Sequence, residues 1–76
     1  MYYNYQKIIK DLYAMMRMPE NREYGHTIQL MLDETVYHYL EANNVPFERQ
    51  EEFLAVMLSD CPQVITDYKT KKFTLS

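Results

Sequence analysis

Apolar residues recur at helical spacing in separate segments of this chain, and residues that interrupt helices lie at the boundaries of those segments. The first segment, residues 5–17, follows Asn4, which is a favourable N-cap, and ends just before Pro19. A polar connector over residues 20–25 ends at the only glycine of the chain. The pattern predicts an amphipathic helix followed by a turn.

The second predicted helix covers residues 28–42, with Thr27 as its N-cap and the two asparagines at positions 43–44 as its end. Leu30 and Tyr37 lie almost opposite the apolar residues that we expect to face the core. Those core-facing residues are Ile28, Met31, Leu32, Thr35, Tyr39 and Ala42. This helix is therefore apolar on two sides.

Two further helices are predicted in the C-terminal part of the chain. Pro46 suits the first turn of a helix that ends near Ser59, and Asp60 can cap a short fourth helix with Pro62 in its first turn. The buried side of the third helix is expected to carry Phe53, Leu54, Val56 and Met57. Residues 69–76 suit either a loose tail or an edge strand.

The expected fold class is all-α, a compact bundle of three main helices plus a short C-terminal helix or extended tail. Residues 1–76 are expected to form a single small helical domain, with residues 70–76 as a flexible tail. The core is expected to form around Ile8, Leu12, Met16, Ile28, Met31, Leu32, Tyr39, Phe53 and Met57.

The size of the chain limits how stable it can be alone. With 76 residues, folding buries only about 60% of the surface that the unfolded chain exposes. Cys61 is the only cysteine, so no disulfide within the chain can add stability, and a reducing compartment is favoured. We expect no signal peptide, because Lys7 and Lys10 interrupt the apolar positions near residue 1, and no apolar run is long enough to cross a bilayer. We expect a cytoplasmic protein without membrane contact.

The charge of the chain changes sign along its length. Residues 20–67 contain ten of the eleven acidic residues and only two arginines, whereas both ends are basic and the formal net charge is −3. An acidic centre repels phosphate and attracts basic protein surfaces. Binding to a protein is therefore expected, rather than direct binding to nucleic acid.

The residue types that usually support catalysis or ligand binding are sparse. His26, His38 and Cys61 are the only imidazole and thiol groups, and their spacing is not that of a metal site. Adjacent carboxylates diverge by about 100° around a helix, so they do not converge on one substrate atom. A phosphate-binding loop rich in glycine is excluded by the single glycine. We expect no enzyme activity, no cofactor and no metal.

Tyrosine is unusually frequent, with eight residues in the chain, and it is a residue type that is enriched at protein interfaces. Tyr2, Tyr3 and Tyr13 are expected to add to an exposed aromatic surface. The candidate partner-binding residues form an apolar centre surrounded by an acidic rim. The apolar residues are Tyr24, Leu30 and Tyr37, and the acidic residues are Asp33, Glu34 and Glu41. The main hypothesis is an acidic protein-binding module that docks on a basic surface of a nucleic-acid enzyme or regulator, by analogy with phage-encoded inhibitors and antitoxins.

Three alternatives remain open at this level. The chain could be a small DNA-binding regulator that uses its basic termini, including Lys69, Lys71 and Lys72. It could self-assemble as a structural subunit or form a homodimer through the second apolar face of the 28–42 helix. That face could also be covered by the fourth helix or by the tail, which would remove the candidate interface.

Overall fold

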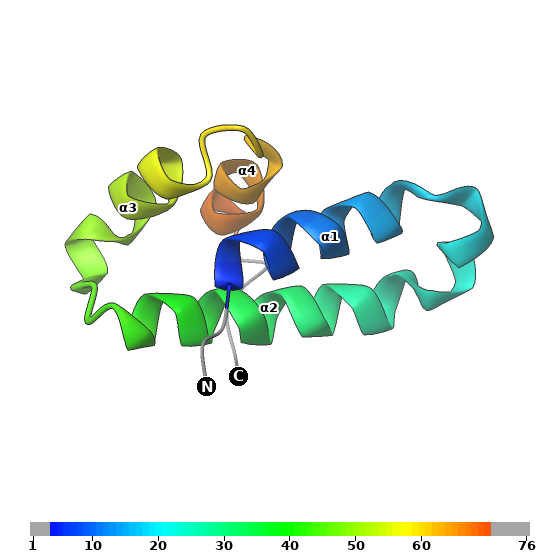
Figure 1. Ribbon diagram of the computed structural model, residues 1–76, viewed down its shortest axis with the longest axis horizontal. Coiled ribbons are helices and arrows are strands. Elements are labelled where there is room, and N and C mark those ends of the chain that lie inside the picture. The colour runs from blue at the N-terminus through cyan, green and yellow to red at the C-terminus, as the bar shows by residue number, and fades with distance from the viewer. Residues whose placement is uncertain (1–3, 71–76) are drawn as a thin grey trace.

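The computed structural model describes residues 4–70, and these residues form four α-helices without a β-strand (Figure 1). The helices are α1 (Tyr5–Arg17), α2 (Gly25–Ala42), α3 (Gln50–Met57) and α4 (Gln63–Lys69), with 3₁₀ turns η1 (Pro19–Tyr24) and η2 (Phe47–Arg49). Helices α1 and α2 lie side by side, and η1 connects them at one end. The all-α prediction is confirmed for the described part of the chain.

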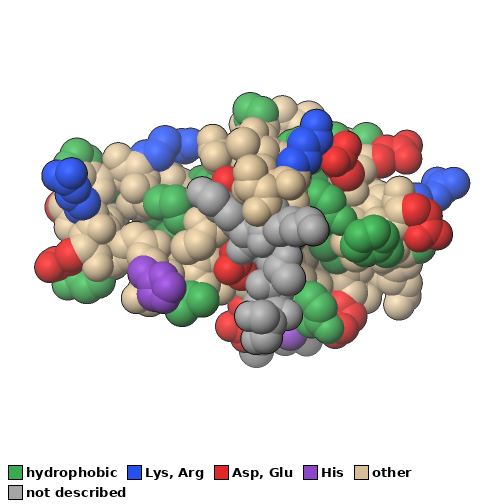
Figure 2. Space-filling view, turned by 180° about the vertical axis from the view of Figure 1, so that it is seen from behind, with side chains coloured by type: hydrophobic (Ala, Val, Ile, Leu, Met, Phe, Trp, Pro, Cys, Tyr) green, Lys and Arg blue, Asp and Glu red, His purple; other side chains and the backbone are tan. Residues whose placement is uncertain are grey.

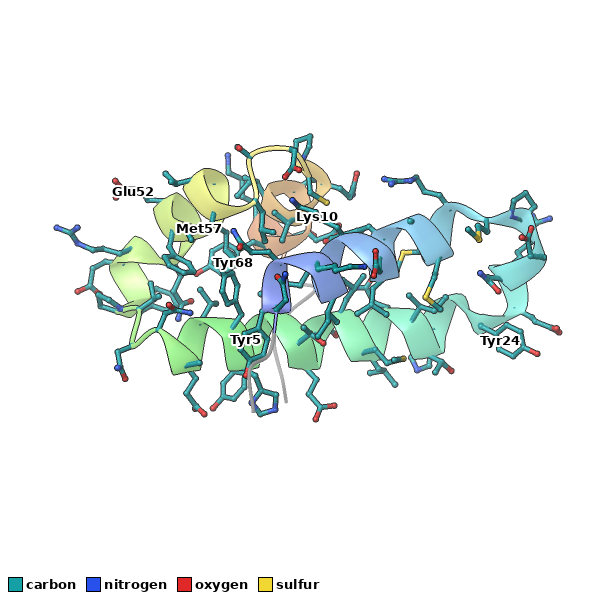
Figure 3. The ribbon with its side chains drawn as sticks, viewed as in Figure 1. Tyr5, Lys10, Tyr24, Glu52, Met57 and Tyr68 are labelled. Carbon is teal, nitrogen blue, oxygen red and sulfur yellow. The ribbon has the colours of Figure 1, made fainter. Side chains whose placement is uncertain are left out.

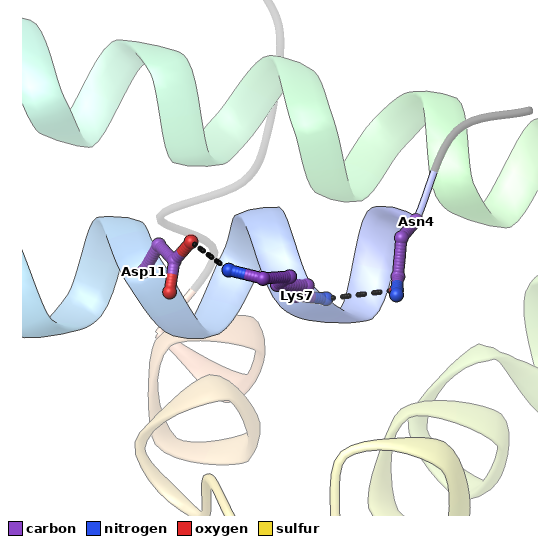
Figure 4. A network of polar contacts seen from close by, with 3 residues as sticks. All are labelled: Asn4, Lys7 and Asp11. Carbon is purple, nitrogen blue, oxygen red and sulfur yellow. Dashed lines mark hydrogen bonds and ion pairs between the residues drawn. The ribbon is translucent and has the colours of Figure 1, made fainter.

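The predicted start of α1 is confirmed. The side-chain oxygen of Asn4 accepts a hydrogen bond from the backbone amide of Lys7 at 3.1 Å, as a helix N-cap should (Figure 4). The ammonium group of Lys7 also lies 3.1 Å from the carboxylate of Asp11 one turn later. The helix ends before Pro19, which begins η1.

The predicted start of α2 is wrong, and its predicted end is confirmed. Thr27 does not cap this helix, because η1 leads directly into Gly25, whose backbone angles are already helical. At the other end, Asn44 adopts a positive φ of 52°, and the amide of Val45 donates to the carbonyl of Leu40 at 3.1 Å. This arrangement is a Schellman motif, in which a residue that tolerates the left-handed conformation ends the helix.

The C-terminal half differs from the expected three main helices. Helix α3 has 8 residues and α4 has 7, against 13 for α1 and 18 for α2. The structure thus has two long helices and two short ones. Asp60 does not cap α4; its carboxylate lies 2.7 Å from the ammonium group of Lys10 on α1. This ion pair connects the α3–α4 loop to α1.

The buried stripe of α1 is rotated relative to the prediction. Ile9, Leu12 and Tyr13 are buried, whereas Ile8 is exposed. The reason is that α1 packs against α2 and also reaches α4, so the side chains between those two contacts are the buried ones. Met31, Val56 and Met57 are likewise exposed, contrary to prediction. The fully buried aliphatic side chains are Ile9, Leu32, Val36, Leu54, Leu58 and Val64.

The tail prediction falls almost entirely on residues that the structure does not describe, since only Thr70 of residues 70–76 is included. The expected exposure of Tyr2 and Tyr3 also lies outside the described residues. Within residues 4–70, no helix combines the length and the apolar character that crossing a membrane requires.

Candidate functional site

The side of α2 that faces away from α1 carries four of the predicted interface residues. Leu30, Glu34, Tyr37 and Glu41 follow one another at intervals of four, three and four positions, so they share one helical face. Leu30 is 53% exposed and Tyr37 is 43% exposed, and both glutamates are exposed. We call these four residues the α2 surface.

This face is exposed because the opposite face of α2 fills the core. Ile28, Leu32 and Val36 are buried and follow the same helical spacing on the other side of the helix. Helix α2 forms the lower edge of the molecule in Figure 1, with α1 packed above it. The second apolar side predicted for this helix therefore lies opposite the buried one, and its residues Leu30 and Tyr37 are exposed.

Neighbouring side chains restrict the position of the Tyr37 ring. The nearby carboxylate of Glu41 raises the pKa of Tyr37 above the usual value. The ring also meets the imidazole of His38 edge-on, with 5.5 Å between ring centres. His38 in turn lies 3.7 Å from the carboxylate of Glu34. The aromatic ring is therefore held between polar neighbours in an exposed position.

Two predicted site residues do not lie on the α2 surface. Asp33 is buried, and its carboxylate accepts a hydrogen bond from the side-chain amide of Gln29 at 3.0 Å. The expectation of an exposed rim that includes Asp33 is wrong, because this position follows Leu32 on the side of α2 that faces inward. Tyr24 is exposed, but it ends η1 at the far end of the molecule (Figure 3). At about 1.5 Å per residue, it lies about 20 Å from Tyr37 along the helix.

Helix α4 does not cover the α2 surface. It contacts α3, and it reaches α1 through a hydrogen bond from the hydroxyl of Tyr13 to the carboxylate of Asp67 at 2.6 Å. Leu30 and Tyr37 accordingly remain exposed. Of the two segments that we expected as possible covers, the helix is excluded, and residues 71–76 lie outside the described part.

The hydrogen bond between Tyr13 and Asp67 is a buried polar contact that the sequence analysis missed. Both side chains are buried, and the side-chain amide of Gln63 donates a second hydrogen bond to Asp67 at 3.1 Å. Burial, helped by the adjacent Asp67, raises the pKa of Tyr13 far above its usual value. The expected exposure of Tyr13 is wrong: the spacing from Ile9 places it on the buried stripe, and Asp67 satisfies its hydroxyl. The contact joins α1 to α4.

We expect the free energy of unfolding to fall as the pH rises above 10.0, the usual pKa of tyrosine. The hydroxyl of Tyr13 ionises near that pH in the unfolded chain but stays protonated in the folded protein, so its contribution is complete below pH 10.0 and is lost above it. The ionisation of one group can lower the free energy of unfolding by at most about 1.4 kcal/mol per pH unit. Urea unfolding at several alkaline pH values should show that the free energy of unfolding of Tyr13→Phe depends less on pH than that of the wild type. An identical pH dependence would contradict the assignment of this effect to Tyr13.

A shallow hollow of about 300 Å³ lies between α1 and the start of α4. Its lining residues are Lys10, Arg17, Asp60, Cys61, Pro62 and Gln63. Burial raises the pKa of Cys61, so the thiol stays protonated and is a poor nucleophile. Lys10 is already paired with Asp60. Among residues 4–70, no three His, Cys, Asp or Glu side chains are placed to hold a metal ion.

The cations at the start of α1 are largely balanced by nearby carboxylates. Lys7 pairs with Asp11, and Lys10 pairs with Asp60. These pairs reduce the positive potential that the DNA-binding alternative requires at this end of the chain. Lys69 is exposed, whereas Lys71 and Lys72 lie outside the described residues.

Comparisons with known proteins supply no further indication of function. The chain matches no protein-family model, no curated protein and no solved structure at a significant level. The α2 surface is a candidate functional site because it combines exposed apolar side chains with exposed carboxylates on one helical face.

Proposed function

We propose that this chain is a non-enzymatic, acidic protein-binding module that docks its α2 surface on a basic surface of a nucleic-acid enzyme or regulator in the cytoplasm. The observation that carries the proposal is the exposure of Leu30 and Tyr37 on the same helical face as Glu34 and Glu41. An apolar centre next to acidic side chains matches the composition of an interface for a cationic partner.

The geometry of Tyr37 supports a central role for this residue in binding. Tyrosine offers a large apolar area with few rotatable bonds, and it is enriched among residues that dominate interface energies. The contacts to Glu41 and His38 reduce the side-chain freedom that would be lost when a partner binds. Burial of the ring against a partner would then contribute to affinity at a small entropic cost.

Charge favours a basic partner over a second copy of the chain. In a two-fold symmetric dimer the same surface meets itself, so Glu34 and Glu41 of one copy would approach those of the other. Carboxylates placed close together repel, whereas lysine and arginine on a partner would attract them. Binding of a basic surface that normally contacts phosphate would exclude DNA or RNA from it, and inhibition would follow from this competition.

The proposal is tested by capture of a basic protein from a lysate of the native host, followed by affinity measurements with purified components. We expect Tyr37→Ala to weaken the complex about tenfold to thirtyfold, because loss of a central aromatic residue typically costs about 1.4–2 kcal/mol. The matched control is Tyr24→Ala, which removes an exposed tyrosine at the far end of the molecule. Equal losses for both variants, with unchanged helical circular dichroism, would argue against the α2 surface.

A further inference from the structure

A second exposed apolar surface lies on η2 and α3. Phe47 is 80% exposed and Val56 is 67% exposed, and they are the most exposed large apolar side chains among residues 4–70. In Figure 1, α3 lies at the upper left, and the segment that contains η2 joins it to the end of α2 at the left of the molecule. We call the exposed side chains of this region the α3 surface, namely Phe47, Glu48, Glu51, Glu52 and Val56.

Phe47 is exposed because other side chains of the same region fill the core. The ring of Phe53 packs against the ring of Tyr39, with 5.2 Å between centres, and Leu54 is fully buried. With positions 53 and 54 facing inward, Val56 falls on the outer side of the helix. The fold thus gains nothing from the Phe47 ring, which remains available to a partner.

Helix α3, which carries Glu51, Glu52 and Val56 of the α3 surface, is anchored at both ends by hydrogen bonds. The hydroxyl of Tyr68 on α4 donates to the side-chain oxygen of Gln50 at 2.8 Å, at the start of α3. The side-chain amide of Gln6 on α1 donates to the backbone carbonyl of Met57 at 2.7 Å, at its end. A surface that is already ordered before binding loses less entropy when a partner docks.

The charge of the α3 surface indicates what kind of partner fits it. Glu48, Glu51 and Glu52 are exposed, and none of them forms an ion pair with another residue in the described range. Arg49 is the only cation between residues 46 and 60. Figure 2 shows apolar and acidic side chains on the right half of the view, with a basic side chain at its right edge. A complementary partner carries lysine or arginine beside apolar side chains.

We propose that the α3 surface is a second docking site, which binds a basic amphipathic segment of a protein. A second copy of the chain fits it less well, because a symmetric contact would bring together the three glutamates of each copy with only one Arg49 from each copy to oppose them. The α3 surface is carried by η2 and α3 and the α2 surface by α2, so the two surfaces belong to different elements of the fold. This inference does not depend on the proposed role of the α2 surface.

The test is a titration of the isotope-labelled full chain with a synthetic peptide that carries leucine on one helical face and lysine on the other. Amide NMR signals report separately on residues 47–56 and on residues 30–41. We expect peptide-induced shifts at residues 47–56, and we expect Phe47→Ala to weaken peptide binding at this site about tenfold. Met15→Ala, which shortens an exposed apolar side chain on α1, is the matched control and should leave the affinity unchanged.

The outcomes separate the two surfaces. Shifts confined to residues 30–41 would overturn the second docking site and leave the proposed function intact. Small changes in the NMR signals near every exposed carboxylate, unaffected by Phe47→Ala, would show that charge alone attracts the peptide. This result would also overturn the second docking site. Absence of peptide binding would overturn it as well. Equal melting temperatures of the wild type and both variants would confirm that the differences reflect binding.

Discussion

Leu54→Ala is expected to lower the free energy of unfolding by about 2–5 kcal/mol, the usual cost of such a truncation in a packed core. Leu54 on α3 is fully buried, and it belongs to the single hydrophobic core of the described residues. A chain of this size has a total stability of only about 4–11 kcal/mol at typical values per residue. The variant should therefore melt at a much lower temperature or fail to fold.

Val56→Ala is the matched control for this substitution, because it shortens an aliphatic side chain on the same helix. Val56 is exposed, so we expect its loss to change stability by less than about 0.5 kcal/mol. Urea unfolding followed by circular dichroism compares the two variants directly. The sequence pattern alone assigns both residues to the buried side of the helix. Equal destabilisation by the two substitutions would therefore contradict the position of α3.

The double substitution Glu34→Lys and Glu41→Lys is expected to weaken the complex with a basic partner by about 100-fold or more. Reversal of both charges replaces attraction with repulsion at the centre of the α2 surface, and like charges across an interface cost several kcal/mol. About 2.8 kcal/mol already corresponds to a factor of 100 in affinity. Titration calorimetry at low and high salt measures the loss and its electrostatic part.

The control for this experiment keeps the net charge the same. Glu20→Lys with Glu23→Lys reverses two exposed glutamates in η1, so each double variant moves the formal net charge from −3 to +1. A long-range effect of net charge would weaken binding equally in both variants. If the partner contacts the α2 surface, binding should weaken mainly in the variant with Glu34→Lys and Glu41→Lys. Equal affinities of the two double variants would count against the proposed interface.

Local features of the sequence predict the long helices well. Asn4 and Pro19 mark the limits of α1, and the asparagines at positions 43–44 mark the end of α2, because capping and helix termination depend on neighbouring residues. The pattern also places Leu30 and Tyr37 correctly on the side of α2 opposite its buried residues. These predictions require no knowledge of distant contacts.

The remaining differences arise from contacts between segments that are far apart in the sequence. Asp60 pairs with Lys10 instead of capping α4, and Tyr13 is buried because Asp67 satisfies its hydroxyl. Neither partner can be identified from helical spacing. Val56 and Met57 are exposed although the pattern places them on the buried side of the helix with Phe53 and Leu54. A periodic pattern identifies apolar faces, but it does not decide which of two apolar residues reaches the core.

Transfer of NMR saturation from a captured basic partner to the methyl groups of this protein tests the central claim most directly. The proposed function predicts a strong loss of signal at the methyl groups of Leu30 in the complex, and no loss at those of Leu58, which is fully buried. Loss at Val56 with none at Leu30 would assign the contact to the α3 surface instead. An unaffected Leu30 in a stable complex would contradict the proposal that the α2 surface binds the partner.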